Sequence, residues 1–345
     1  MNDGGRCLKM RYDKILLEHG AGGLLMSELI AGMFLPRFDN VYLERLEDSA
    51  VFQLGGMRLC FSTDSYVVDP LFFPGGDIGS LSVHGTVNDI AVCGGTPLFL
   101  SAGFILEEGF DTDDLEKIVD SMARAAAGAG VKVVTGDTKV VAKGAADRIF
   151  INVSGIGVIH YGGTISPRSI EPGDVVIVSG TIGDHGAAIL SARQEFGLRS
   201  SILSDSAPLN LLVESILKVS PAIHCMRDVT RGGLGAVLCE IASQSQCRVV
   251  IEEKDIPVHD GVRGICEILG LDHLFLASEG KIVVFCPSGD AGRVVDAMRS
   301  HDLGRDTTII GNVFEKGQGR LVMNTSIGGS REVDLPTGEL VPRIC

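Results

Sequence analysis

Residues 77–106 of the chain read DIGSLSVHGTVNDIAVCGGTPLFLSAGFIL, a helical pattern followed directly by an extended one. Asp77 is suited to cap the start of the helix, because its carboxylate can accept hydrogen bonds from the first free backbone N–H groups. Two glycines and a proline end that helix after about Cys93. The apolar run over residues 98–106 then predicts a strand. The stretch therefore predicts a helix packed on a strand, which is the unit of an α+β layer.

The same mixture of elements continues on both sides of this stretch. Before it, residues 50–64 hold two extended runs around a Gly-Gly turn, which predicts a β-hairpin. After it, a helix is expected from Asp111, and strands are expected near residues 131–134 and 148–159. These elements predict a first α+β domain over residues 1–164.

A domain boundary is predicted at residues 165–174, which contain two prolines and several turn-forming residues between two expected strands. Strands and helices alternate again beyond it, which predicts a second domain of mixed sheet and helices over residues 165–323. Residues 324–345 are rich in glycine and serine and then in proline, and we expect them to form a flexible tail.

The composition limits the classes of function. The 345 residues are 45% hydrophobic and 21% charged, which excludes a disordered chain and allows two cores of ordinary size. The formal charge of −14 disfavours nucleic-acid binding, which needs a basic face. No apolar run reaches the roughly 18 residues of a membrane span, and residues 1–6 lack the pattern of a signal peptide. We therefore expect a cytoplasmic protein that contacts neither membrane nor nucleic acid.

The nine cysteines are scattered singly, which predicts neither a disulfide framework nor a zinc site. One of them, Cys345, ends the chain. A terminal segment is fixed on one side only, so it can enter or leave a pocket without unfolding anything else. Cys345 can therefore be delivered to chemistry, or it can be a chance cysteine on a frayed end.

Four aspartates of the first domain lie at predicted strand or helix ends between apolar residues. A carboxylate buried there is costly unless it is paired or binds a cation. Mg²⁺ that bridges nucleotide phosphates takes a few carboxylates and keeps several waters. The group predicts a Mg²⁺–nucleotide site, whereas any one member can be an ordinary cap or turn residue. The four are Asp48, Asp64, Asp89 and Asp137.

Other residues suit parts of such a site. The loop from His19 to Gly23 runs into a helical pattern and can cradle an anion, but it is neither a Walker A loop nor a complete dinucleotide fingerprint. Lys139 can meet a phosphate or deprotonate a substrate, or lie as a solvated surface lysine. Glu279, in a tight turn between apolar strands, can be a general base or a surface hairpin residue. His84 and His185 are expected in hydrogen-bonded structural roles.

Together these motifs resemble the HypE family of hydrogenase maturation proteins, within the superfamily of aminoimidazole ribonucleotide synthetase, selenophosphate synthetase and thiamine-monophosphate kinase. The resemblance covers essentially the whole chain, and only the terminal motif is specific to the HypE family. The motifs are His19-Gly20-Ala21-Gly22-Gly23, Ser62-Thr63-Asp64-Ser65-Tyr66-Val67-Val68-Asp69-Pro70, Val87-Asn88-Asp89, Gly136-Asp137-Thr138-Lys139, Gly183-Asp184-His185-Gly186, Arg227-Asp228-Val229-Thr230-Arg231-Gly232-Gly233, Ala277-Ser278-Glu279-Gly280 and Pro342-Arg343-Ile344-Cys345.

The resemblance implies a two-domain PurM-like (AIR synthetase-like) α+β architecture and a homodimer that pairs through the sheets of the first domains. It also implies a reaction. The carbamoyltransferase HypF carbamoylates the terminal thiol, and the family member uses ATP and Mg²⁺ to dehydrate the S-carboxamide to an S-cyanide. The cyanide then passes to iron on a HypC–HypD scaffold, for the NiFe hydrogenase centre.

By motif position, the resemblance makes Cys345 the covalent carrier and gives proton removal to Glu279 and Lys139. It gives nucleotide binding to Gly20, Gly22, Gly23 and Thr138 together with the four aspartates, Asp48, Asp64, Asp89 and Asp137, which are also the candidates for Mg²⁺.

Two other classes of function stay open at this stage. A small-molecule kinase or synthetase of the same superfamily would share the aspartates and the glycine loop but need no terminal cysteine. A binding protein would dock its tail on a scaffold and show no ATP turnover.

Overall fold

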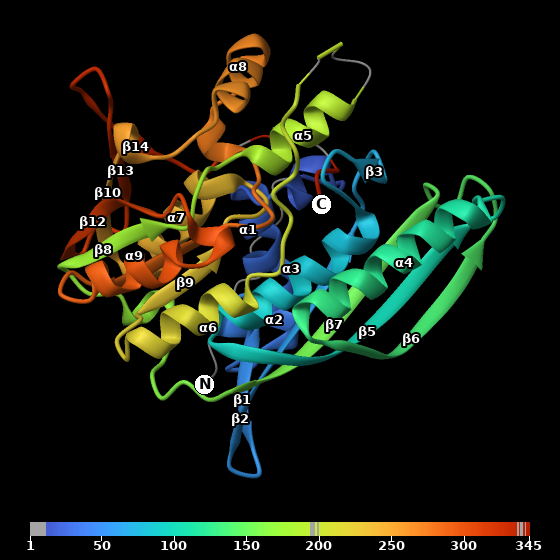
Figure 1. Cartoon of the computed structure of the whole chain (residues 1–345), viewed down its shortest axis with the longest axis horizontal. Helices are drawn as coiled ribbons and strands as arrows, with labels where there is room; N and C mark the ends of the chain where they lie inside the picture. Colours follow the sequence, from blue (N-terminus) through green and yellow to red (C-terminus); the bar gives the residue numbers. More distant parts are fainter. Residues whose placement is uncertain (1–11, 194–196, 199, 337, 339–340, 342) are drawn as a thin grey trace.

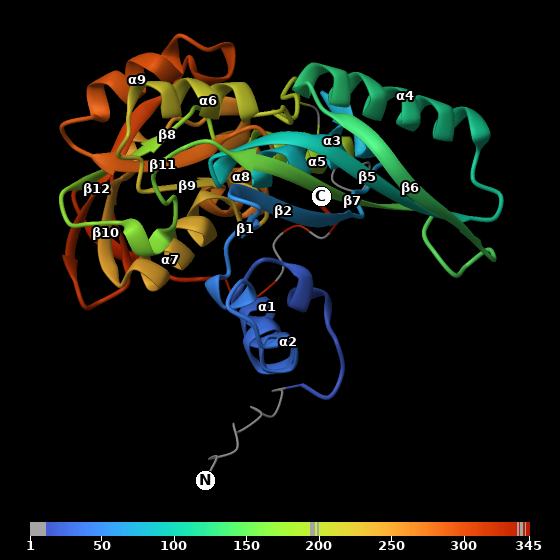
Figure 2. The same cartoon turned by 90° about the horizontal axis from the view of Figure 1, so that it is seen from below.

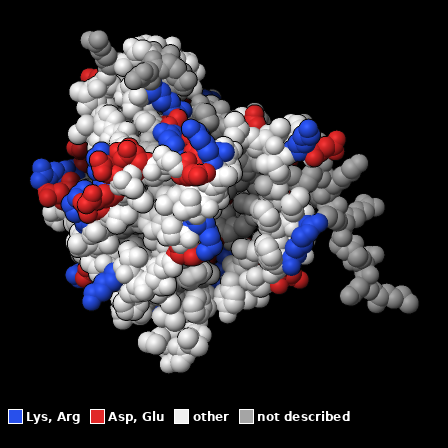
Figure 3. Space-filling view, turned by 90° about the vertical axis from the view of Figure 1, so that its right-hand side faces the viewer, with Lys and Arg blue, Asp and Glu red and all other residues white. Residues whose placement is uncertain are grey.

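The computed structural model describes residues 12–193, 197–198, 200–336, 338, 341 and 343–345. Two layered α+β units lie side by side in it (Figure 1). Among the described residues, no helix combines the length and the apolar character that crossing a bilayer requires. On the face shown in Figure 3, acidic and basic side chains mostly lie beside one another instead of forming a continuous basic surface.

The first unit is built on a five-stranded sheet in the order β1-β2-β7-β5-β6. The predicted β-hairpin is present as its first two strands, and β5 pairs with β6 in parallel and with β7 antiparallel. Helices α3 and α4 cover one face of the sheet (Figure 2). The strands are β1 (Ala50–Leu54), β2 (Met57–Tyr66), β5 (Gly95–Glu107), β6 (Lys132–Val141) and β7 (Ile149–Ile159), and the helices are α3 (Ile78–Val92) and α4 (Thr112–Ala129).

The helix predicted from Asp77 is confirmed as α3. Oδ1 of Asp77 accepts hydrogen bonds from the backbone N–H groups of Gly79 at 2.7 Å and Ser80 at 3.1 Å. This cap satisfies two of the donors that a helix leaves free at its start. A two-stranded ribbon, β3 (Phe72–Phe73) with β4 (Gly76–Asp77), leads into the helix.

The second unit is built on a seven-stranded sheet in the order β14-β13-β10-β12-β8-β11-β9. Its strands are β8 (Asp174–Val178), β9 (Cys225–Asp228), β10 (Cys247–Glu252), β11 (Ile282–Pro287), β12 (Thr308–Lys316), β13 (Leu321–Asn324) and β14 (Ser330–Val333). Its helices are α5 (Asp184–Ala192), α6 (Asn210–Val219), α7 (Gly233–Ser245), α8 (Asp260–Leu269) and α9 (Ala291–Arg299).

The predicted start of the tail at residue 324 is wrong. Ser330–Val333 form β14, which pairs antiparallel with β13, so the sheet continues past that boundary. The last described residues are not free either: Ile344 and Cys345 are 5% and 8% exposed and belong to a core that also takes side chains from α3, α5 and α8. The end of the chain is therefore seated between the two units.

An N-terminal segment lies apart from both sheets and below the first (Figure 2). It contains α1 (Leu24–Leu29), a π-helical turn (Ile30–Phe34) and α2 (Leu35–Phe38). Its loop reaches the chain end, because the N–H of Leu24 donates a hydrogen bond to the carbonyl of Pro336 at 3.2 Å.

Candidate functional site

A cavity of about 510 Å³ lies where the N-terminal segment, the first sheet, the loop after β9 and the chain terminus meet. Residues from both units line it, so it forms only when the two units pack together. The lining residues that bear on chemistry are Gly22, Gly23, Asp48, Asp64, Tyr66, Asp89, Arg227, Asp228, Arg231, Glu240, Glu279 and Cys345.

Three aspartates gather on one side of this cavity. Carboxylate oxygens of Asp48, Asp89 and Asp228 all lie within 4.8 Å of one another. Asp48 comes just before β1, Asp89 lies in the last turn of α3, and Asp228 ends β9. Three carboxylates so close together repel one another unless protons or a cation neutralise them.

Burial is the main cause of raised pKa values in this cluster. The pKa of Asp228 rises to about 8, first because of burial and then because of the charge on Asp48. Burial also raises the pKa of Asp48, although the Arg227 guanidinium, 2.8 Å away, opposes that shift. The pKa of Asp89 is raised well above its ordinary range by burial and by the charge on Asp64.

The cluster fits Mg²⁺. It supplies hard oxygen ligands from three different elements, and the adjoining cavity has room for the waters that the ion keeps. Asp64 faces the same cavity from β2, and its carboxylate accepts a hydrogen bond from the Tyr66 hydroxyl at 3.1 Å. The structure thus brings together Asp48, Asp64 and Asp89, as expected from the sequence.

Asp137, Thr138 and Lys139 are not brought to the cavity of the single chain. They lie on β6, the edge strand, where Lys139 and Asp137 form an ion pair at 2.7 Å with side chains 67% and 70% exposed. Pairing with β5 aligns Asp137 with Gly103 and Lys139 with the exposed Ile105, on the face of the sheet opposite α3 and α4.

The predicted glycine loop packs against protein. A Cβ on Gly23 would lie 2.4 Å from the carbonyl oxygen of Pro336, and one on Gly22 would lie 3.1 Å from that of Arg231. The Arg231 guanidinium also donates a hydrogen bond to the Gly20 carbonyl at 2.9 Å. Gly22 and Gly23 border the cavity, so the absence of side chains there lets the N-terminal loop close over the chain end.

The terminal thiol lies inside the cavity. The Arg231 guanidinium donates a hydrogen bond to Sγ of Cys345 at 2.9 Å, and the N–H of Val67 donates one to a main-chain oxygen of Cys345 at 3.2 Å. Burial raises the pKa of the Cys345 thiol to about 11, and the positive charge of Arg231 only partly opposes that rise. The seated thiol is therefore protonated at neutral pH and is a weak nucleophile.

Glu279 lies in the same cavity and is 2% exposed. No described residue forms a hydrogen bond with its Oε1 atom. Burial, followed by the charges of Asp228 and Asp205, raises the pKa of Glu279 well above its ordinary range. A buried carboxyl with a free oxygen in the same cavity as the thiol is suited to exchange a proton with a group carried on that thiol.

Sequence reasoning missed Asp228 and Arg231 as site residues. Both lie in the Arg227–Gly233 motif, which was quoted for the family resemblance without a role for either residue. Asp228 meets the criterion used for the other aspartates, since it is a carboxylate at the end of a buried strand. No local pattern marks Arg231, because its role depends on a terminus more than 100 residues further along the chain.

Comparisons with known proteins show the family of the chain. The family described as AIR synthase related protein, N-terminal domain, matches residues 46–159, and that described as AIR synthase related protein, C-terminal domain, matches residues 171–324. The carbamoyl dehydratase HypE of Cupriavidus necator is 50% identical over 341 residues, which cover 99% of this chain and 97% of that protein.

Two solved structures are similar over nearly the whole chain. The hydrogenase maturation protein HypE in complex with ATP has a TM-score of 0.81 and 47% identity, and the match covers 96% of this chain and 100% of that one. A chain from a HypE–HypF complex has a TM-score of 0.85 and 50% identity, with 89% of this chain and 99% of that one covered.

Proposed function

The chain belongs to the family of carbamoyl dehydratase HypE, and from that premise we propose that it converts an S-carboxamide on its own Cys345 into an S-cyanide with ATP. The observation that carries the proposal is the position of the terminal thiol, which lies buried in one cavity with Glu279 and the aspartate cluster. A small-molecule kinase would instead need this space for a free substrate.

The reaction balances with ATP as co-substrate. The carboxamide oxygen takes the γ-phosphoryl group and leaves as phosphate, the nitrogen loses its two protons, and the products are the S-cyanide, ADP and phosphate. An amide oxygen is a poor leaving group, whereas phosphate is a good one, so the chemistry requires both phosphorylation and a base near the nitrogen.

The chain's own residues suit the proton removal. Oε1 of Glu279 is free to accept a proton, and Arg231, which donates to the sulfur, holds the carrier in the cavity. The loop at Gly22 and Gly23 closes over the chain end and keeps water from the reacting group. Asp48, Asp64, Asp89 and Asp228 would hold Mg²⁺, which when bound supplies positive charge that offsets the phosphates and the crowded carboxylates.

The chain is proposed to act as a homodimer, because its first sheet has an uncovered apolar face. Phe61, Phe99 and Ile105 on that face are 45%, 46% and 44% exposed, and Asp137 and Lys139 share it. A second copy packed there would cover these side chains. Lys139, the second proposed base, then acts on the carboxamide of the partner subunit, together with Asp137 and Thr138 as nucleotide contacts.

Complementation between two inactive variants tests this arrangement. We expect Lys139→Ala and Glu279→Gln to be inactive alone. If Lys139 acts across the dimer, mixing the protomers restores about a quarter of the wild-type activity, because half of the dimers are mixed and each holds one intact site. No recovery in dimers that exchange protomers would show that Lys139 acts within its own chain.

The protonation of the seated thiol bears on where the partner proteins act. We propose that HypF loads the carbamoyl group and that a HypC–HypD scaffold receives the cyanide for the iron of the NiFe hydrogenase centre. The protonated thiol must leave its seat to be loaded, since its pKa is about 11 there. We place these steps in the cytoplasm, where the cysteines that the structure describes as free would stay reduced.

Intact mass decides the proposal. The protein is incubated with HypF, carbamoyl phosphate and ATP, and a mass increase corresponding first to a carboxamide and then to a cyanide is expected. Cys345→Ala should keep its fold and bind ATP but acquire neither group. The carbamoylated protein is then separated from HypF and given fresh ATP. A carboxamide that never converts under these conditions would favour a binding module over an enzyme.

A further inference from the structure

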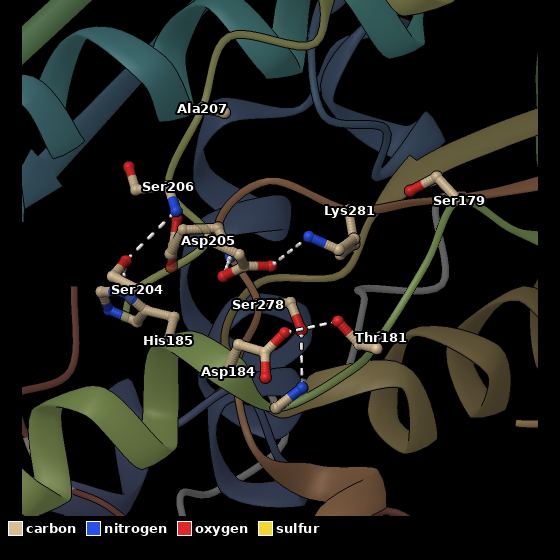
Figure 4. Close-up of polar contacts among 12 residues, drawn as sticks. Ser179, Thr181, Asp184, His185, Ser204, Asp205, Ser206, Ala207, Ser278 and Lys281 are labelled. Atoms are coloured by element: carbon tan, nitrogen blue, oxygen red, sulfur yellow. Dashed lines mark hydrogen bonds and ion pairs between the residues drawn. The ribbon is translucent and has the colours of Figure 1, made fainter. Parts of the chain in front are cut away.

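A polar segment links the seat of the terminal thiol to the turn that carries Glu279. It comprises Ser204, Asp205 and Ser206, and we refer to it as the serine segment. Figure 4 shows Ser204 beside His185 on one side and Asp205 beside Lys281 on the other. Each member makes its own contact, so the segment touches three separate elements.

His185 connects this segment to the chain terminus. It lies at the start of α5 with no exposed surface. Its Nε2 atom lies 2.7 Å from the carbonyl oxygen of Ile344, and its Nδ1 atom lies 2.8 Å from the hydroxyl of Ser204. A carbonyl can only accept, so Nε2 carries the proton, and in the neutral ring Nδ1 then accepts from Ser204.

Asp205 fixes the opposite end. Its Oδ1 accepts a hydrogen bond from the backbone N–H of Glu279 at 3.0 Å, and its Oδ2 lies 3.1 Å from Nζ of Lys281. A Cβ on Gly280 would lie 1.8 Å from the Asp205 carbonyl oxygen, so the segment packs directly on the turn. The same three residues thus position the proposed base and, through His185, the residue next to the thiol.

We propose that His185 is a positioning residue that holds the Ile344 carbonyl and so seats the Cys345 thiol, or the group it carries, beside Arg231 and Glu279. The inference rests on the proposed function only in that Cys345 is the carrier. The bond differs from an ordinary buried hydrogen bond in one respect, because it must break whenever the terminus leaves to meet a partner. Its strength therefore sets the fraction of seated carrier.

Alkylation of Cys345 by iodoacetamide measures that fraction without ATP or any partner. A seated thiol is buried and protonated, so the reagent attacks chiefly the released form, and peptide mass mapping distinguishes Cys345 from the other cysteines. His185→Leu removes the bond to Ile344 at similar volume, and we expect about tenfold faster alkylation of Cys345. Ser204→Ala, which removes the partner of Nδ1, should raise the rate by about threefold.

His84→Leu is the matched control. His84 forms a hydrogen bond at 2.9 Å with Ser206, so this variant also loses a histidine–serine bond to the serine segment, but it leaves the bond from His185 to Ile344 in place. Its Cys345 alkylation rate should stay within about twofold of wild type. His185→Gln, whose amide N–H can replace the Nε2 donor, should restore most of the protection.

Single-turnover kinetics give a second readout. Alkylation follows the released fraction of the carrier, whereas conversion follows the seated fraction. While most of the carrier stays seated, the carboxamide conversion rate of His185→Leu should therefore fall by much less than the factor by which alkylation rises, and the ATP concentration for half-maximal rate should stay unchanged. Unchanged alkylation in both folded His185→Leu and folded Ser204→Ala would overturn the proposal, as would equal rises in His84→Leu and His185→Leu. Because alkylation requires no dehydration, the proposed function can fail while this inference stands, and the reverse also holds.

Discussion

Replacing Glu279 with glutamine should abolish conversion without weakening the fold. The wild-type carboxyl is 2% exposed, and its pKa is raised well above the ordinary range by burial and by Asp228 and Asp205. Glutamine has nearly the same shape and carries no charge. The substitution therefore removes the base and, at the same time, removes the repulsion that the ionised carboxylate suffers.

The two effects have opposite signs. Loss of a general base slows the dehydration about 10²- to 10⁴-fold, which corresponds to roughly 3–5 kcal/mol in the activation free energy. A raised folded-state pKa means that the folded protein binds the Glu279 proton more tightly than the unfolded chain does. The stability from that proton is complete below the ordinary pKa of 4.5 and is lost as pH rises through the folded-state value. The glutamine variant keeps it, so its melting temperature should equal or exceed that of wild type, increasingly so as the pH rises above the ordinary pKa of 4.5.

The assay uses carrier that HypF has carbamoylated and from which HypF has been removed. Wild type and variant are mixed with ATP and Mg²⁺, quenched at intervals and weighed intact, so carboxamide and cyanide are counted directly. Glu240→Gln is the control, because Glu240 borders the same cavity but forms an ion pair with Arg227 at 3.5 Å. A conversion rate of Glu279→Gln within about threefold of wild type would refute the role of Glu279 as the base. If Glu240→Gln lost as much conversion as Glu279→Gln, the charge in the cavity would matter and not Glu279 in particular.

Three further outcomes follow from the same geometry. Asp228→Asn should weaken Mg²⁺-dependent ATP binding at least about tenfold in calorimetry, since it removes one of three clustered carboxylates; unchanged affinity would place the ion elsewhere. Raising the pH to about 10 should lower the ratio of seated to released terminus about tenfold, because the pKa of Cys345 is about 11 in the seat against an ordinary 9.0, and the stability that the thiol proton gives the seat is complete below pH 9.0 and lost towards pH 11. The alkylation rate of Cys345, divided by that of a peptide with the same C-terminal sequence, measures the released fraction. A rate ratio that does not change with pH would contradict the burial of the thiol. Gly23→Ala should raise the alkylation rate of Cys345 severalfold, because the added Cβ would lie 2.4 Å from the Pro336 carbonyl oxygen and displace the terminus. Alkylation as slow as in wild type would show that the loop shifts without moving the tail.

Local patterns predicted the elements and part of the site. The cap at Asp77, the hairpin and the strand-end aspartates depend on neighbours close in sequence, so composition and spacing reveal them. Asp228 also ends a buried strand and could have been found by the same criterion, whereas Arg231 acts through a contact with the chain end, which no local pattern reports. The sequence likewise cannot show which face of β6 is covered.

The start of the tail was misplaced for a related reason. The glycine- and serine-rich composition after residue 324 is typical of a loop, and the turn between β13 and β14 does use it. The hydrogen bonds that make Ser330–Val333 a strand come from backbone N–H and C=O groups, which every residue except proline carries alike. Composition therefore marked the turn correctly but could not show that the chain returns to the sheet after it.

The pKa of the seated thiol implies that loading takes place outside the cavity and dehydration inside it. A rise from 9.0 to about 11 is worth roughly 2.7 kcal/mol and makes the thiolate about a hundredfold rarer in the seat than outside it. Loading needs the thiolate and is therefore favoured outside, whereas a carboxamide or a cyanide is neutral and meets no such penalty inside. Burial therefore favours seating of the loaded carrier over seating of the carrier with an ionised thiol. Burial gives no preference between the carboxamide and the cyanide, because both are neutral. Release of the product must therefore come from a partner that competes for the terminus. The hydrogen bond from His185 to Ile344 is one contact that such a partner has to replace.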